Sequence, residues 1–526
     1  MNIVKMNNCS VAICLLLAFG LSGCAGISRY KGPDPTDQQS PDHVVCADLA
    51  VLPQKMTPYA ERAGIHKLLL PLERQNLDDA LFNERFFKPW TLAQAQAARD
   101  AFLAVQAMKP ARGFIENNRP FPLERWETLT ANCALERYPG KIRYGITVRN
   151  TSLRLMPTDT PFFLHPRKGG EGFPFDYFQN SALWAGAPLA ITHTSRDGLW
   201  VYVETRAACG WAPVAHVAEM DAAMRKLWQR ATFAAILKDG TLLRAHDGPA
   251  DAASGERPSI VAHIGAMFPL AAGNTTGSGT LRVMLPTRGA DGKARARVAL
   301  LDAHDAAQRP LPLTPGNIAR VADTMMGQPY GWGGLFEQRD CSAAMRDLFA
   351  PFGIWLPRNS GEQARWGRRI TVAGLSADEK ERAIMAQGIP FLSLVCLHGH
   401  VGLYLGNYPV DGVERPVMFH NIWGIRVKNP YKQSTAVARK NASSGNDEDA
   451  GRLMYAIGAD DRAIIGKTVI TTLRPGAELP WIASPASLLD RIDGLSILPE
   501  FEGKDMVPKK TANSMRKAKK AGMSNT

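Results

Sequence analysis

The chain has 526 residues, of which 45% are hydrophobic and 21% are charged, and its formal net charge is +13. This composition excludes a generally disordered chain, and the length is sufficient for roughly three or four domains. The charge does not indicate a nucleic-acid partner, because a tail after Gly503 contributes 7 − 1 = +6 of it. The seven basic residues of the tail are Lys504, Lys509, Lys510, Arg516, Lys517, Lys519 and Lys520, and its one acidic residue is Asp505. We interpret residues 491–526 as a disordered basic tail rather than an electrostatic anchor.

The N-terminus has the pattern of an export signal that ends at a lipidated cysteine. Lys5 precedes an apolar run, Val11 to Leu21, which is too short to span a bilayer. The run ends in LSGC, which is similar to a bacterial lipobox in which Cys24 carries the lipid. A generic signal peptide with a chance cysteine is the alternative. We predict a signal peptide over 1–23, a tether over 24–45, and a lipid-anchored protein on the periplasmic face of a bacterial membrane, with Ala25 favouring the outer membrane.

The eight cysteines separate by expected role. Cys9 and Cys14 leave with the signal peptide, and Cys24 is lipidated. The remaining cysteines are Cys46, Cys133, Cys209, Cys341 and Cys396. Disulfides can form in an exported protein. An odd number of cysteines leaves at least one thiol outside a disulfide, as a nucleophile requires. Cys46 and Cys133 are the expected pair because they bound one predicted domain, although spacing alone does not fix the connectivity.

The signals between residues 46 and 139 are helical, and we predict a helical N-terminal domain there. Thr91 is positioned to cap a helix that continues to about Met108, where Pro110 stops it. Trp126, Leu129 and Cys133 share one face of a second predicted helix. The aromatic segment FNERFFKPW is interpreted as a loop whose rings pack rather than bind.

Beyond Tyr138 the hydrophobic period changes to two, which indicates strands. Predicted strands at 144–148, 189–192 and 199–204 belong to a small barrel over 140–220. A helix near 222–229 precedes a second predicted barrel over 221–312, with strands at 233–238, 281–285 and 296–300 and a turn at Asp291-Gly292. Neither barrel contains a spacing that indicates catalysis.

The last predicted domain, 313–490, opens with a helix that Thr314 caps and Gly327 ends. A loop rich in glycine and aromatics, YGWGGLFEQR, then leads to DCSAAMRDLF, which places Cys341 in the first turn of an amphipathic helix. Unpaired backbone N–H groups and the positive end of the helix dipole favour a thiolate at that position. A lone cysteine is more commonly a buried structural residue, so a nucleophile requires further support.

A nucleophilic thiol needs a general base and a polar group that orients it. The segment HVGLYLG places His400 at the start of a strand, and turn residues near 410 precede a returning strand at 417–421. In such a hairpin, residues whose numbers sum to about 820 lie opposite one another, so His400 faces His420. His398 shares the strand face of His400 and competes with it. A metal site of Cys396 with these histidines is the alternative, although alternation on one strand is a weak metal signature.

Several of these segments resemble a known family. YGWGG, DCSAAMRDLFAPFGIWLPRNS, HGHVGLYLG and FHN resemble the NlpC family of papain-like cell-wall cysteine peptidases. Upstream, FNERFFKPW, RYGITVRNTSLRLMPT and FDYFQNSAL resemble a multidomain branch of that family. The resemblance implies a multidomain α+β fold with a helical N-terminal domain, two bacterial SH3-like barrels and a papain-like catalytic domain. It also implies that Cys341 attacks, His400 is the base and His420 orients His400, with no cofactor and no metal.

The same resemblance implies a substrate. The expected reaction is hydrolysis of the γ-D-glutamyl to diaminopimelate bond of peptidoglycan stem peptides through a thioester, with a preference for a free N-terminal L-Ala. The expected substrate contacts are Tyr330, Asp340, Ser342, Arg358 and Ser360, with Asp176 as a candidate for the residue that selects the free amine. We expect a monomer whose partners are peptidoglycan and, through its lipid, the membrane. A non-catalytic peptidoglycan-binding scaffold and another papain-like amidase or acyltransferase are the alternatives.

Overall fold

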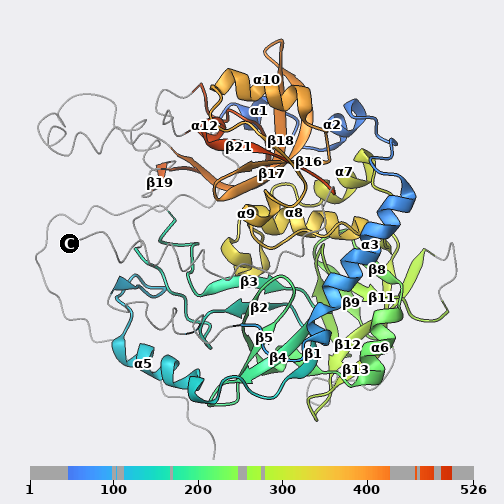
Figure 1. Cartoon of the computed structure of the whole chain (residues 1–526), viewed down its shortest axis with the longest axis vertical. Coiled ribbons are helices and arrows are strands. Elements are labelled where there is room, and N and C mark those ends of the chain that lie inside the picture. The colour runs from blue at the N-terminus through green and yellow to red at the C-terminus, as the bar shows by residue number, and fades with distance from the viewer. Residues whose placement is uncertain are drawn as a thin grey trace, which may run out of the picture. The chain divides into compact units, whose positions relative to one another are not determined.

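The structure is a computed structural model that describes residues 46–97, 102, 112–165, 170–246, 257–273, 279–426, 457–458, 462–478 and 487–499. The predicted signal peptide, Cys24, the tether and residues 500–526 of the predicted tail lie outside this set. Across the described ranges, no helix is both long enough and apolar enough to span a bilayer. Figure 1 shows the elements in chain order.

An antiparallel sheet organises the C-terminal part of the chain. Its strands lie in the order β15-β21-β16-β17-β18-β20-β19. They are β15 (Arg368–Thr371), β16 (Ser393–Leu397), β17 (His400–Val410), β18 (Val413–Arg426), β19 (Ile457–Gly458), β20 (Arg462–Thr472) and β21 (Ile492–Ile497). The helices and 3-10 turns of this part are α7 (Pro315–Asp323), η6 (Trp332–Glu337), α8 (Cys341–Phe349), η7 (Ala350–Phe352), α9 (Ser360–Gln363), α10 (Ala377–Gln387) and α12 (Leu488–Arg491).

Two helices cover this sheet. α8 contacts β17 and β18, and α10 contacts β18 and β21. Figure 1 shows α8 and α10 on opposite sides of these strands. The Cys341 helix therefore packs directly against the two strands that carry His400 and His420.

The predicted boundary of the tail at residue 490 is wrong. β21 lies inside the sheet, where Leu495 pairs with Ile370 of β15 on one side and with Val395 of β16 on the other. Leu495 and Ile497 are buried. The apolar run that forms this strand is short and stands close to the basic tail, so composition alone assigned it to the tail.

Residues 143–219 form what we call the first β unit. Its strand order is β3-β2-β6-β5-β4-β1-β7. The strands are β1 (Arg143–Thr147), β2 (Thr151–Arg154), β3 (Gln179–Leu183), β4 (Pro188–Thr194), β5 (Trp200–Glu204), β6 (Cys209–Pro213) and β7 (Val217–Glu219), with the 3-10 turn η5 (Val214–His216). The three strands predicted from alternation are confirmed as β1, β4 and β5.

Residues 233–308 form the second β unit, which α6 (Ala222–Arg230) precedes. Its described strands make three small sheets, β10-β9, β11-β8-β14 and β12-β13. They are β8 (Phe233–Ile236), β9 (Thr241–Arg244), β10 (Ser259–Ala262), β11 (Met267–Pro269), β12 (Thr280–Arg288), β13 (Ala294–Asp302) and β14 (Ala306–Gln308). The predicted turn at Asp291-Gly292 is confirmed, because Arg288 pairs with Ala294 across it. Trp184 of the first β unit shares a core with Phe268 and Val283 of the second.

The helices between residues 46 and 139 do not share one core, which differs from the predicted helical domain. The described elements are α1 (Asp48–Val51), α2 (Thr57–Arg62), α3 (Leu72–Phe87), η2 (Lys88–Thr91), α5 (Leu123–Asn132) and η4 (Leu135–Arg137). Met56 and Tyr59 join the core of the C-terminal part, whereas Phe87 packs with Phe233 and Trp126 packs with Trp211 of β6. The segment therefore packs against all the other parts of the described chain.

Three local predictions in this segment have different outcomes. The face of Trp126, Leu129 and Cys133 is confirmed, because all three are buried. The loop predicted for FNERFFKPW is wrong, because α3 continues to Phe87, although its rings do pack in the core. Thr91 does not cap a helix, since its hydroxyl donates to the Lys88 carbonyl at the end of η2. Most of the remainder of that predicted helix lies outside the described residues.

The structure does not join Cys46 and Cys133 by the expected disulfide. Cys46 packs with Ile422 and Val469 of the C-terminal sheet. Cys133 packs in a separate core with Trp126 and Met156. The two residues stand at the ends of the helical segment, but its ends pack against different parts of the molecule.

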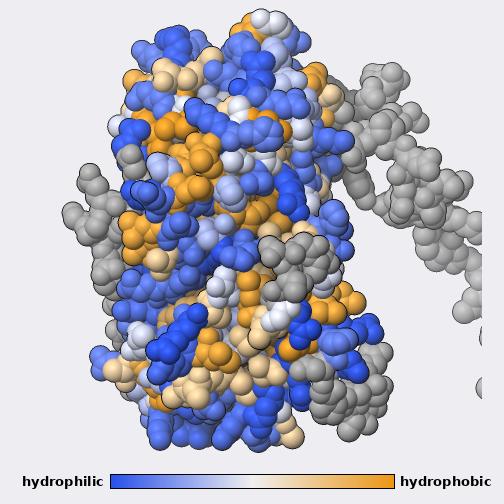
Figure 2. All heavy atoms as spheres, turned by 90° about the vertical axis from the view of Figure 1, so that its right-hand side faces the viewer, coloured by the Kyte–Doolittle hydropathy of each residue, from blue (hydrophilic) through white to orange (hydrophobic). Residues whose placement is uncertain are grey.

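The surface mixes polar and apolar residues. Figure 2 shows hydrophilic residues interspersed with apolar areas on the face that forms the right-hand side of Figure 1. Exposed large apolar side chains include Leu77 of α3, Leu199, Leu300 of β13 and Phe336 of η6. These residues come from different parts of the chain, so they do not by themselves indicate a functional site.

Candidate active site

Cys341 is the first residue of α8, as the sequence predicts. The Asp340 carboxylate caps the helix by accepting from the backbone N–H of Ala343 at 2.8 Å. Ala344 and Leu348, one helical turn apart, are buried in the core and fix the helix against the sheet. The thiol is nearly enclosed, with 6% of the residue exposed.

The loop before α8 requires glycine for a close approach. Gly333 has φ 62° and Gly334 has φ 89°, which L side chains rarely adopt. A Cβ on Gly334 would lie 2.5 Å from the Ala182 Cβ of β3. Gln179 of β3 donates to the Gly333 carbonyl at 3.1 Å, and the Gly333 N–H donates to Asp340 at 3.2 Å. The first β unit therefore supports the loop that holds the Cys341 helix start.

The surroundings of Cys341 favour the neutral thiol in the free protein. Burial and then the nearby Asp340 carboxylate raise the pKa of the Cys341 thiol to about 12. The backbone N–H of Val401, the Arg358 guanidinium and the backbone N–H of Ser342 act in the opposite direction and lower this pKa. The structure therefore differs from the expectation that the helix start favours a thiolate at Cys341, because desolvation outweighs the helix N–H groups.

His400 and His420 lie together, as the sequence predicts. His400 Nε2 is 2.8 Å from His420 Nδ1. The register is displaced from the predicted one, because Leu403 pairs with Phe419 and Tyr404 with Met418. The two imidazoles are therefore diagonal neighbours on one face rather than directly opposite. The helix α8, which begins at Cys341, contacts both β17, which begins at His400, and β18, which carries His420. The thiol and the two imidazoles therefore lie in the same part of the fold.

Hydrogen bonds around His420 assign the tautomers of both histidines. The Thr471 hydroxyl donates to the Thr472 carbonyl at 2.7 Å and lies 3.1 Å from His420 Nε2. Because the hydroxyl proton is committed, Nε2–H of His420 is the donor in that contact. His420 Nδ1 then accepts from His400 Nε2–H. The lone pair of His400 Nδ1 is left for a substrate or thiol proton.

Burial keeps both histidines neutral. It lowers the pKa of His400 to about 4, with Arg491 adding to the shift. Burial and then His400 hold the pKa of His420 well below its ordinary range. A neutral His400 beside a neutral thiol is the state in which the imidazole can accept a proton.

A buried ion pair lies beside the thiol on the side of the first β unit. Arg358 donates to Asp340 at 2.7 and 3.1 Å and to the Ser342 hydroxyl at 3.1 Å. Ser181 of β3 accepts from Arg358 Nε at 2.9 Å. Burial raises the pKa of Asp340, but Arg358 outweighs it and holds this pKa below its ordinary value. In the free protein the predicted substrate contacts Asp340, Ser342 and Arg358 are therefore bonded to one another.

Aromatic side chains surround Tyr330. The Phe175 ring lies 5.2 Å from Trp332 and 6.4 Å from Tyr330, between ring centroids, and the Trp423 ring lies 6.1 Å from Tyr330. Burial raises the pKa of Tyr330 well above its ordinary value, and Cys341 and Asp340 add to the shift. Phe175 belongs to the first β unit, so this unit contributes a wall as well as support.

Other predicted residues do not join this arrangement. Asp176 is buried in an ion pair with Arg154 at 2.6 Å. Its carboxylate also accepts from the backbone N–H groups of Phe162 and Phe178. Because its oxygens are occupied, Asp176 is structural rather than a substrate contact.

Ser360 begins α9 and is partly exposed. His398 is exposed between β16 and β17, with its carbonyl accepting from Arg491, so it does not share the His400 face. Within the described ranges no three His, Cys, Asp or Glu side chains gather as metal ligands.

Sequence reasoning missed Ser181 and Thr471, and also Arg339, which lies next to Asp340. Ser181 is 177 residues from the arginine that it contacts, and Thr471 is 51 residues from His420. No local motif marks either residue. The run TVITT consists of β-branched residues and indicates a strand at 468–472.

Comparisons with known proteins cover most of this architecture. Residues 327–441 match the model of the NlpC/P60 family, residues 12–138 match that of the NLPC_P60 stabilising domain, and residues 161–213 match that of an SH3 domain of the SH3b1 type. A structure described as an NlpC/P60 endopeptidase from Photobacterium damselae subsp. piscicida has a TM-score of 0.72 at 22% identity, and the match covers 86% of this chain and 98% of that one. This likeness shows the fold.

Two curated relatives match shorter stretches. A protein of Corynebacterium glutamicum named as a probable endopeptidase is 29% identical over 23% of this chain and 54% of its own length. The probable endopeptidase NlpC homolog of Haemophilus influenzae is 34% identical over 17% of this chain and 44% of its own length. The chain thus spans about half the length of the curated relatives that it matches.

Proposed function

Because the chain belongs to the NlpC/P60 family, we propose that it is a cysteine peptidase that hydrolyses the peptides of bacterial peptidoglycan. The observation that carries the proposal is the contact between His400 and His420 at 2.8 Å beside the Cys341 helix start. A thiol, a neutral imidazole and a group that orients the imidazole are the parts that nucleophilic catalysis needs.

Each group has a defined task in the proposed reaction. His400 Nδ1 takes the thiol proton while the Cys341 sulfur attacks the scissile carbonyl. The carbonyl oxygen becomes an oxyanion near the backbone N–H of Cys341, which is unpaired within the helix because it lies in the first turn. His400 returns the proton to the leaving amine, and a thioester remains. Water that His400 deprotonates then hydrolyses the thioester and restores the thiol.

The neutral resting pair follows from the pKa values. Burial raises the pKa of Cys341 to about 12 and lowers that of His400 to about 4, so the neutral thiol and the neutral imidazole are favoured in the free protein. The rate of thiol labelling in the free protein therefore does not separate an enzyme from a scaffold. Cleavage of a defined peptide does.

The proposed bond lies between γ-D-glutamate and diaminopimelate, in a stem peptide with a free N-terminal L-Ala. The Arg358–Asp340–Ser342 network supports a polar, charged substrate, since it places charged and hydroxyl groups beside the thiol. In the free protein these groups bond to one another, so a substrate that contacts them exchanges some of these bonds for its own. The contribution of Phe175 from the first β unit supports a cleft that is closed on one side. We also propose that the protein is a monomer anchored at Cys24 to the periplasmic face of a membrane, with the SH3-type domain contacting peptidoglycan.

The test is the product pattern on defined substrates. Full-length protein is incubated with L-Ala-γ-D-Glu-diaminopimelate, with the same peptide acetylated at the L-Ala amine, and with a disaccharide-linked muropeptide, and the products are identified by mass spectrometry. The proposal predicts L-Ala-D-Glu and free diaminopimelate from the first substrate and little product from the other two. Equal cleavage of all three contradicts the free-amine preference, and cleavage at another amide identifies a different papain-like amidase.

The scaffold alternative gives a different result in the same experiment. A scaffold binds insoluble peptidoglycan in a sedimentation assay and cleaves none of the three substrates. The intact arrangement of Cys341, His400 and His420 favours the enzyme.

A further inference from the structure

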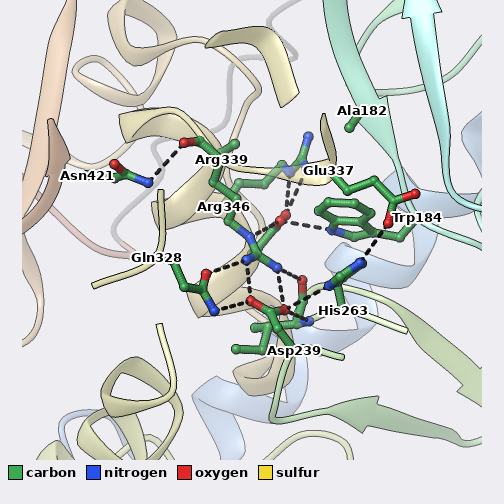
Figure 3. Close-up of polar contacts among 12 residues, drawn as sticks. Ala182, Trp184, Asp239, His263, Gln328, Glu337, Arg339, Arg346 and Asn421 are labelled. Atoms are coloured by element: carbon green, nitrogen blue, oxygen red, sulfur yellow. Dashed lines mark hydrogen bonds and ion pairs between the residues drawn. The ribbon is translucent and has the colours of Figure 1, made fainter. Parts of the chain in front are cut away.

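A second buried charged cluster lies behind Cys341, on the side of the second β unit. Figure 3 shows Arg339 at its centre, with side chains that converge on it from three parts of the chain. Arg339 pairs with Asp239 at 2.6 Å and with Asp347 of α8 at 2.7 Å. The side chains of Arg339 and Asp347 are only 3% and 2% exposed.

Every donor of the Arg339 guanidinium is occupied. Besides Asp239 and Asp347, it donates to Gln328 Oε1 at 3.2 Å and to the Ile264 carbonyl at 2.8 Å. The Trp184 ring lies 5.3 Å from the guanidinium carbon and donates its own N–H to Asp347. A guanidinium with five donors in use has none left for a ligand, so this cluster acts through position rather than by binding.

The backbone of Arg339 connects the cluster to both halves of the candidate site. Its carbonyl accepts from Asn421 Nδ2 at 2.9 Å, and Asn421 follows His420 on β18. The same carbonyl accepts from the Gly331 N–H at 2.8 Å, which closes the loop before α8. Asp340 and Cys341 come next in the sequence. One residue therefore contacts the strand of His420 and precedes the helix start of Cys341.

The second β unit extends the cluster through His263. His263 Nε2 is 2.8 Å from Glu337, and Nδ1 is 3.5 Å from Asp239. Asn150 of the first β unit donates to Glu337 at 2.8 Å. Phe336 and Glu337 both have positive φ, 55° and 59°, a conformation that costs free energy unless neighbours hold it. Asp239 and His263 thus hold the C-terminal end of the loop between Gly331 and Arg339, Asp239 through Arg339 and His263 through Glu337.

We propose that Arg339 is a positioning residue for Cys341, His400 and His420, and that the second β unit serves the reaction by supplying Asp239 and His263 to hold Arg339 and the loop. This inference rests on the proposed peptidase function. It assigns the second β unit a part in the chemical step rather than in recognition of the cell wall. A small displacement of the thiol relative to His400 is sufficient to slow the reaction strongly.

The test compares two matched substitutions in the full-length chain. Asp239→Asn removes the carboxylate that pairs with Arg339, and Asp305→Asn removes one that pairs with the neighbouring Lys238 at 3.7 Å on the surface. With L-Ala-γ-D-Glu-diaminopimelate, we expect kcat of Asp239→Asn to fall by about tenfold or more with KM within about twofold. We expect both parameters of Asp305→Asn to stay within about twofold of wild type.

The split between kcat and KM distinguishes positioning from other roles. A rise in KM with unchanged kcat overturns the proposal, because the second β unit then contributes to substrate binding. The proposal is also overturned if Asp239→Asn is folded, as judged by circular dichroism, and its kcat and KM are unchanged. If Asp239→Asn does not fold, His263→Gln decides, with an expected fall in kcat of about threefold at constant KM. Wild-type kcat in that variant contradicts the proposal.

A second readout does not depend on catalysis. Hydrogen exchange of residues 331–345, followed by mass spectrometry, is expected to be at least about fivefold faster in Asp239→Asn than in Asp305→Asn. If wild type does not cleave the peptide, the proposed function fails while this comparison still tests the cluster. Equal exchange in the two variants then overturns the positioning role.

Discussion

Arg339 and Asp340 are adjacent in the sequence, but their charges are balanced by different parts of the molecule. Asp340 faces Arg358, which Ser181 of the first β unit orients. Arg339 faces Asp239 of the second β unit and Asp347 of α8. The side of the first β unit, here called the first side, also contains the Phe175 ring, which packs on Trp332. On the side of the second β unit, the second side, every N–H donor of Arg339 is already hydrogen-bonded within the protein. The comparison teaches that one β unit places aromatic rings and Ser181 beside the Cys341 helix start, whereas the other pairs with Arg339 on the opposite side of that helix start.

The largest expected effect comes from the first side. Arg358→Met leaves the Asp340 carboxylate buried without its counter-charge, so we expect a loss of about 3 to 5 kcal/mol in the free energy of unfolding. Urea unfolding followed by circular dichroism measures it. The control is Arg62→Met, which breaks the exposed Arg62–Glu414 pair at 2.8 Å and is expected to cost at most about 1 kcal/mol. Equal losses in the two variants contradict the buried role of Arg358.

The next largest expected effect is on substrate binding, which we expect to depend on the first β unit. Phe175→Ala removes the ring that packs on Trp332 and Tyr330, and we expect KM for the tripeptide to rise by about tenfold with a smaller change in kcat. Phe173→Ala, two residues away at a position that is 63% exposed, is the control and is expected to stay within about twofold. If only kcat falls in Phe175→Ala, the first β unit contributes to the chemical step rather than to substrate binding. That result contradicts the proposed difference between the two β units.

The pH profile tests the neutral state of His400. Since burial lowers the pKa of His400 to about 4, kcat/KM is expected to remain near its maximum at pH 5.5. An imidazole with the ordinary pKa of 6.5 loses activity about tenfold there. Steady-state cleavage measured between pH 4.5 and 7 decides, and an acid limb near pH 6.5 contradicts the buried, neutral pair.

The smallest effect concerns His263 on the second side. Burial lowers its pKa, but Asp239 and Glu337 outweigh burial and raise the pKa from 6.5 to about 9. A pKa raised by folding stabilises the fold fully below pH 6.5, and this contribution is lost as the pH rises through 9. Because Glu337 is 49% exposed, we expect only roughly 1 to 2 kcal/mol. Urea unfolding at pH 6 and pH 10 measures it, and His263→Gln is expected to lose this part of the pH dependence.

The parts of the site that sequence predicted are those that local patterns encode. The Gly-rich loop before α8, the apolar spacing of α8 and the turn residues before Val413 extend over about ten residues each, so the helix start at Cys341 and the hairpin of His400 and His420 could be predicted. The register was displaced because the turn lies at Asp411 and Gly412, between paired Val410 and Val413, rather than centred at residue 410. The bulge between Tyr404 and Gly406 shifts the pairing by one residue back towards the predicted register.

The parts that sequence did not predict depend on distant pairings. Asp239 lies 100 residues before Arg339. The helical segment that starts at Cys46 packs against three different parts of the described chain instead of forming its own core. β21 is a strand of six residues that pairs on both sides, with β15 and β16. Its neighbour in sequence is the charged tail, and the composition of the tail led to the wrong assignment. Tertiary pairing of this kind leaves no periodic signal in a single sequence.

The central claim is that the Cys341 thiol attacks the substrate, and one comparison tests it most directly. Cleavage of L-Ala-γ-D-Glu-diaminopimelate is followed by mass spectrometry for wild type, Cys341→Ala and Cys396→Ala, with folding checked by circular dichroism. Cys396 is a buried free thiol on β16 and provides the matched control. The account predicts no detectable product with Cys341→Ala and near wild-type cleavage with Cys396→Ala. Cleavage that persists in folded Cys341→Ala contradicts it.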